Sequence, residues 1–193
     1  MKRNPQKRDL FIMARLTTFL TAFAFLALAA LPGQAKAADI YETLKADPQF
    51  SILVQIIEGA DLEWRYQDER PRTVFAPVNA AFESIPGGYE DMLPPLNPST
   101  KENVSALLLY QIVPGRVRPE TLTGQVTSMT TFQRGKVMID GTKDPLRYGG
   151  RFGGNVAGPS QEASNGLIVP LDAMPIPQFE EVTPPKLDAP EAQ

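Results

Sequence analysis

The chain has 193 residues, with 19 Lys and Arg, 22 Asp and Glu, and neither histidine nor cysteine. These absences exclude Ser-His-Asp and Cys-His nucleophiles, Cys/His zinc sites and a disulfide scaffold. No Asp-x-Asp-x-Asp-Gly calcium loop is present either. From these absences together, we assign no catalytic residue and expect no metal and no cofactor.

Residues 1–37 have the pattern of a secretory signal peptide. Basic residues precede an apolar run from Leu16 to Pro32, and Ala35-Lys36-Ala37 places small residues where a signal peptidase cuts. We predict cleavage after Ala37, with Ala35 as the second choice. The alternative is an uncleaved anchor, because the apolar run of 17 residues reaches the lower limit for a membrane span.

Removal of the signal would change the charge of the remaining chain. Residues 1–37 hold six of the basic residues and one of the acids, so the rest has 13 basic and 21 acidic residues and a net charge of about −8. Such a surface repels nucleic acid and anionic lipid headgroups. We therefore predict a protein of the periplasm, the medium or the cell surface, with no nucleic-acid partner and no membrane span after cleavage.

The chain directly after the signal predicts helices. Asp39–Leu44 has the pattern of a short amphipathic helix. Asp47-Pro48 is a helix start, and apolar residues then recur at helical spacing as far as Gly59. The charged stretch Asp61–Pro71 is predicted to be a surface loop.

A strand and two further helices are predicted next. The β-rich run Thr73–Ala76 predicts a short buried strand, which the following proline stops. Asn79 is a good N-cap for a helix over Ala80–Ile85. Ser99 and Glu102 have the spacing of a capping box at the start of a longer helix.

The second half of the chain predicts strands. Val126–Phe132, Val137–Asp140 and Leu167–Leu171 have β-rich composition, and Asp140-Gly141 is a hairpin-turn signal. Arg147–Asn155 is predicted to be a glycine-rich loop, and residues 178–193 a disordered, acidic, proline-rich tail. We therefore predict an α+β fold in one domain over residues 38–177, with the helices mainly in its N-terminal half.

Three short segments carry a family resemblance. They read TVFAPVNAAF at Thr73–Phe82, YQIVPG at Tyr110–Gly115 and NGLIVPLD at Asn165–Asp172. Together they resemble the fasciclin-like domain, which implies a β-wedge or sandwich with helices packed on one side. The resemblance also implies an exported adhesion or matrix-contact module. The motif residues expected to be structural are Thr73, Phe75, Pro77, Asn79, Phe82, Pro114, Gly115, Asn165, Gly166 and Asp172.

The chain departs from the family pattern at the two usual histidines. Gln111 follows Tyr110 where the family has histidine, and Val169 occupies the second histidine position. Any contact that depends on histidine protonation is therefore expected to be lost. Pro170 has no backbone donor, so we expect an edge or a bend in the strand there. Asp172 is expected to hold backbone amides.

Two segments are candidates for a partner-binding surface. The first is Tyr110, Gln111 and Ile112, although Tyr110 has the alternative of a core tyrosine. The second is the loop with Arg147, Tyr148, Arg151 and Phe152, where arginine and aromatic side chains would suit an anionic glycan or carboxylate. The alternative for this loop is a hairpin with solvated arginines.

We predict an exported, non-enzymatic binding module that contacts an unknown protein or glycan of the cell surface, matrix or envelope. One alternative is a hydrolase of envelope glycan, which would need two carboxylates converging in a cleft. The other is a periplasmic carrier of a small apolar ligand, which would need an apolar pocket between sheet and helices.

Overall fold

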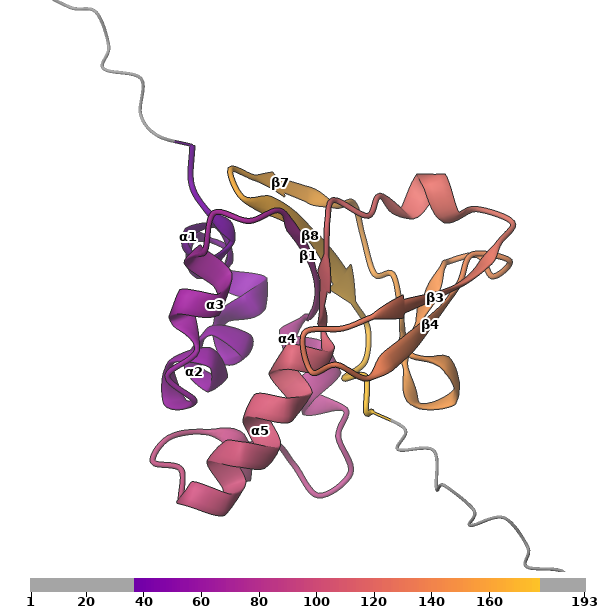
Figure 1. The fold of residues 1–193 in the computed structure, drawn as a ribbon. Helices are drawn as coiled ribbons and strands as arrows, with labels where there is room; N and C mark the ends of the chain where they lie inside the picture. Colours follow the sequence, from indigo (N-terminus) through magenta and orange to yellow (C-terminus); the bar gives the residue numbers. More distant parts are fainter. Residues whose placement is uncertain (1–36, 178–193) are drawn as a thin grey trace, which may run out of the picture. The chain divides into compact units, whose positions relative to one another are not determined.

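The computed structural model describes residues 37–177 (Figure 1). Residues 1–36 of the predicted signal peptide and the whole predicted C-terminal tail lie outside this range. The helices and 3-10 turns are α1 (Ile40–Ala46), η1 (Pro48–Phe50), α2 (Ser51–Gly59), α3 (Glu63–Gln67), α4 (Asn79–Glu83), η2 (Glu90–Met92), α5 (Pro98–Tyr110), η3 (Pro119–Leu122) and η4 (Gly150–Phe152).

The first helices follow the predicted local signals. The Asp39 carboxylate accepts a hydrogen bond from the Glu42 amide at 2.8 Å, and the Glu42 carboxylate accepts one from the Asp39 amide at 3.1 Å. This reciprocal pair is the capping box of α1. Asp47 caps η1, and α2 ends at Gly59 as predicted.

The expected surface loop over Asp61–Pro71 is wrong, because this stretch contains α3. Tyr66 in α3 is fully buried. The sequence did not predict α3 because the helix has only five residues and lies among charged ones. Its single buried side chain gives almost no periodic signal.

Both predicted caps of the later helices are also wrong. Val78, not Asn79, is the N-cap of α4. Asn97 caps α5 by accepting a hydrogen bond from the Thr100 amide at 2.9 Å, so the Ser99/Glu102 pattern placed the cap two residues too late. Pro98 then occupies the first helical position, where its missing amide costs nothing.

The first sheet has the strand order β2-β1-β8-β7. Its strands are β1 (Arg72–Pro77), β2 (Ile112–Pro114), β7 (Gln161–Ala163) and β8 (Gly166–Leu171). Strands β1 and β8 pair in parallel, and β2 and β7 are antiparallel to their neighbours.

The second sheet is antiparallel, with the order β3-β4-β5-β6. Its strands are β3 (Val126–Thr130), β4 (Lys136–Asp140), β5 (Arg147–Tyr148) and β6 (Gly154–Asn155). The predicted loop Arg147–Asn155 is therefore wrong, because β5, η4 and β6 make it a small hairpin. The turn predicted at Asp140-Gly141 is instead the start of a longer connection between β4 and β5.

The first sheet lies between the helices and the second sheet (Figure 1). Alternate residues of its two central strands point to opposite sides. Val74, Ala76 and Ile168 join the cluster with the helices, whereas Phe75 and Val169 join the cluster with Val137, Ile139 and Tyr148 of the second sheet. The predicted α+β sandwich with helices packed on one side is confirmed.

Candidate functional site

The three motif segments lie next to one another in the first sheet. Thr73 is the register partner of Val113 in β2 and of Leu167 in β8. Segments that are far apart in sequence therefore form one continuous structural unit.

Thr73 and Gly115 fix the chain after β2. The buried Thr73 hydroxyl donates to the Gly115 carbonyl at 2.8 Å and accepts from the Val117 amide at 2.8 Å. Gly115 has φ of +84°, a conformation that side-chain-bearing residues rarely adopt. Pro114, directly before it, is exposed.

Asn165 and Gly166 join the start of β8 to the helical layer. The buried Asn165 side chain accepts from the Ile40 amide at 2.9 Å and donates to the carbonyls of Tyr66 at 2.7 Å and Asp68 at 2.9 Å. Gly166 packs against the Arg72 backbone so closely that a Cβ would lie 2.0 Å from the Arg72 carbonyl oxygen.

Asp172 holds a backbone amide, as expected. Its carboxylate accepts from the Asn155 amide at 2.7 Å and from the Asn155 side chain at 2.9 Å. The end of β8 is thereby joined to β6 in the other sheet.

The first motif supplies core contacts and one link between helices. Phe75 stacks on Tyr148 with ring centroids 4.1 Å apart, and Phe82 is fully buried. Asn79 accepts from the Ile52 amide at 3.0 Å and donates to the Pro48 carbonyl and the Ser51 hydroxyl, each at 3.0 Å. Asn79 therefore caps the start of α2 rather than its own helix. Pro77 is the register partner of Leu171.

The two positions that usually hold histidine flank the same residue. The Phe75 amide donates to the Gln111 carbonyl at 2.9 Å, and Phe75 is the register partner of Val169 on its other side. Both replacements are fully buried. The Gln111 amide nitrogen donates to the Met174 sulfur at 2.9 Å, and its oxygen has no hydrogen-bond partner within residues 37–177.

Several expected surface residues are buried. Tyr110 is 4% exposed, and Gln111, Ile112 and Tyr148 are fully buried. The Tyr148 hydroxyl donates to the Tyr110 carbonyl at 2.5 Å, and burial raises the pKa of Tyr148 well above its usual value. The expectation that these four side chains form a contact surface is wrong, because all four are buried. Tyr110 and Tyr148 pack between the two sheets, whereas Ile112 packs in the cluster with the helices.

Arg147 and Phe152 of the Arg147–Asn155 segment lie outside that core. Arg147 donates from Nε to the Gly150 carbonyl at 2.7 Å and from the guanidinium to Asn155 Oδ1 at 3.1 Å, so it holds the β5–β6 hairpin together. Phe152 is 54% exposed. The placement of the Arg151 side chain is not described, and its binding role stays a prediction.

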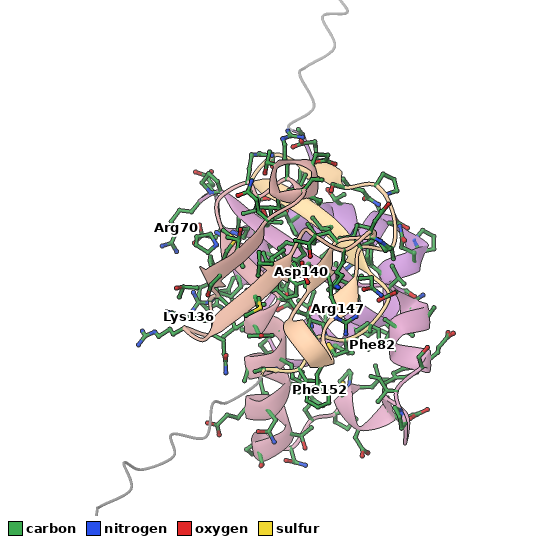
Figure 2. All side chains as sticks on the ribbon, turned by 90° about the vertical axis from the view of Figure 1, so that its right-hand side faces the viewer. Arg70, Phe82, Lys136, Asp140, Arg147 and Phe152 are labelled. Atoms are coloured by element: carbon green, nitrogen blue, oxygen red, sulfur yellow. The ribbon has the colours of Figure 1, made fainter. Side chains whose placement is uncertain are left out.

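The outer side of the second sheet, with η4 beside it, carries three of the five large hydrophobic residues that are exposed among residues 37–177. We define the outer sheet face by the outward residues of β3 and β4, together with Phe152 of η4; they are Val126, Ser128, Thr130, Lys136, Met138, Asp140 and Phe152. Val126, Met138 and Phe152 are each more than half exposed. Figure 2 views this face directly, with Lys136, Asp140 and Phe152 on the near side.

Arg72 is the most important residue that the sequence analysis missed. It is fully buried. Its guanidinium donates to the backbone carbonyls of Arg70 and Arg65 and to that of Asp68, and it forms an ion pair of 2.7 Å with the Asp68 carboxylate. It thereby satisfies carbonyls at the end of α3 that have no helical partner.

Two open cavities are found among the described residues. One, of about 460 Å³, lies beside Glu90, Asp91 and the following prolines; the other, of about 600 Å³, lies beside Glu120, Asp144 and Leu146. Their carboxylates are exposed to solvent. Within residues 37–177, no cluster of three acidic residues could hold a metal ion, and no helix is long and apolar enough to cross a bilayer.

Comparisons with known proteins extend the resemblance. The model of the Fasciclin domain family matches residues 48–177. A protein of Synechocystis named sll1483 is 32% identical over 142 residues, which cover 72% of this chain and 73% of that protein. Human periostin is 27% identical over 108 residues, 55% of this chain but only 12% of periostin. A solved FAS1 domain pair from the insect cell adhesion molecule fasciclin I has a TM-score of 0.61 at 14% identity, covering 72% of this chain and 51% of the pair.

Proposed function

Because this chain belongs to the Fasciclin domain family, we propose that it is an exported, non-enzymatic binding module that mediates adhesion or cell-envelope contact. The match to a cell adhesion molecule and to periostin supports a binding role. The partner is a protein or glycan of the surface to which the module attaches.

The outer sheet face is the surface that we assign to this contact. Of the five large hydrophobic residues exposed within the described range, Val126 and Met138 lie on this face, and Phe152 lies in the adjoining η4. A fourth, Ile176, donates its amide to the Phe152 carbonyl at 3.0 Å. Such clustering of exposed apolar side chains is typical of an interaction surface.

The loss of both family histidines supports a contact that does not depend on histidine protonation. Gln111 and Val169 are both buried, on either side of Phe75. A contact through the outer sheet face would use residues that the family motifs do not mark.

Photo-crosslinking of the chain to the envelope and medium of its native cells tests the proposal. We expect a specific partner whose capture falls at least tenfold, or by about 1.4 kcal/mol in affinity, for Met138→Lys combined with Phe152→Ala. Trp64→Ala is the matched control, since Trp64 is 52% exposed but lies on α3. Equal capture by both variants would reject the outer sheet face, and turnover of envelope glycan by the purified chain would reject the non-enzymatic assignment.

A further inference from the structure

Strand β3 is an edge of the second sheet. The Gly141 amide donates to the Gln125 carbonyl at 2.7 Å, and the Thr131 amide donates to the Gly135 carbonyl at 2.9 Å. Hydrogen-bonded pairs alternate along an antiparallel ladder, so between these two pairs Thr127 and Met129 direct their backbone groups toward β4. The backbone groups of Val126, Ser128 and Thr130 therefore point away from the sheet.

This edge contains no charged residue, proline or bulge that would oppose pairing. Exposed edge strands are normally guarded by charged residues, proline or a bulge. The five residues of β3 read VTSMT, and their register with β4 is continuous from Val126 to Thr130. Val126, Ser128 and Thr130 are also exposed at their side chains.

We propose that β3 pairs with β3 of a second copy of this chain, antiparallel about a twofold axis through Ser128. This inference deepens the proposed binding function by naming one partner. In that register Ser128 lies opposite Ser128 of the second copy, and Val126 lies opposite its Thr130. The outward backbone groups then form about six hydrogen bonds, and no charged residue faces another across the new pair.

The charges on β4 favour the same register. Asp140 lies opposite Val126, and Lys136 lies opposite Thr130. Pairing therefore places Asp140 of each copy in the same cross-strand row as Lys136 of the other, roughly 14 Å away at ordinary strand spacing. This arrangement offsets part of the repulsion between two acidic molecules.

Sedimentation velocity over a concentration series tests self-association. The sample is the chain as it is purified from cells that express the whole sequence, with no engineered truncation. We expect a weak, reversible dimer whose formation increases with salt, because salt screens the net repulsion. Ser128→Lys and Ser128→Glu each place like charges opposite one another, so each alone should weaken association at least about tenfold. An equimolar mixture of the two should restore it as a heterodimer. A mixture that stays monomeric while the unmodified chain dimerises would overturn the β3 assignment.

Cysteine cross-linking gives an independent measurement. The chain contains no cysteine, and opposed residues of an antiparallel pair lie within disulfide range. Ser128→Cys should oxidise to a covalent dimer much faster than Ser99→Cys, an exposed site on α5. Equal rates, or a monomeric unmodified chain that instead binds an extended peptide at β3, would overturn the proposal. Either result leaves the envelope-contact function intact, because that function is measured by capture and depends on Met138 and Phe152.

Discussion

At the scale of single residues, the fold depends on polar side chains buried between layers. Arg72 from β1 and Asn165 from the turn before β8 converge on the backbone around α3. Both side chains are at least 95% buried. A helix of five residues gains little stability by itself, so these donors are what hold its C-terminal end in place.

Replacement of Asn165 by alanine is expected to destabilise the protein by about 2–4 kcal/mol. The change removes the acceptor of the Ile40 amide and one donor to each of the carbonyls of Tyr66 and Asp68 in a buried site. The Asp68 carbonyl keeps its hydrogen bond from Arg72. Urea denaturation followed by circular dichroism measures the effect. Asn103→Ala is the control, because Asn103 is exposed; equal midpoints for the two variants would show that the Asn165 contacts contribute little.

At the scale of elements, the caps of α5 can be tested directly. Asn97→Ala removes the acceptor for the Thr100 amide and should cost about 1 kcal/mol. Ser99→Ala, at the position that the sequence pattern favoured as the cap, should change the unfolding free energy by no more than about 0.5 kcal/mol. A larger loss for Ser99→Ala would mean that α5 begins later in solution.

The strands of the core were predictable because their sequence signals are local. Thr73–Ala76 and Leu167–Leu171 are continuous β-rich runs, and both fall within strands buried along their whole length. Pro170 was expected at an edge or bend. It lies two residues after Ile168, the last residue of β8 that pairs with β7. The Pro170 carbonyl accepts a hydrogen bond from the Ala157 amide at 2.9 Å. Its missing donor therefore falls on the side away from β1.

The residues that the sequence did not place are those whose surroundings come from distant parts of the chain. Arg72 is a charged residue whose burial depends on carbonyls of α3. Tyr148 sits among glycines that predict a loop, yet it packs against Phe75 from the other sheet. The candidate contact surface was misplaced for the same reason, because alternation within β3 and β4, not motif letters, decides which side chains face outward.

At the scale of the whole molecule, electrostatics predict a simple response to pH. The pKa of the Asp68 carboxyl is held far below its usual value, first by side-chain hydrogen bonds from Arg70. The pKa values of Glu58 and Asp140 are also lowered, mainly by hydrogen bonds from Tyr41 and Thr142 respectively. A lowered folded-state pKa contributes stability above the unfolded-state pKa, and that stability is lost as the pH falls through the folded value.

We therefore expect the unfolding free energy to be nearly flat from pH 6 to 8 and to fall below about pH 4, near the ordinary aspartate pKa of 3.8. Denaturant midpoints across this range measure it. The Asp68→Asn variant should have a lower unfolding free energy at pH 7 than the unmodified chain. Its unfolding free energy should also fall less than that of the unmodified chain when the pH is lowered. A steep change between pH 6 and 8 would indicate a strongly shifted group elsewhere and would favour the hydrolase alternative.

The parallel pairing of β1 with β8 also decides when the protein can fold during its synthesis. The paired residues lie roughly 90 positions apart along the chain, and β8 contributes side chains to both hydrophobic clusters. While β8 is still inside the ribosome, both hydrophobic clusters of the nascent chain lack the side chains of β8. One side of β1 is also unpaired. Folding is consequently a late event with a high loop-closure cost. An almost complete chain therefore stays loosely organised until its last strand emerges.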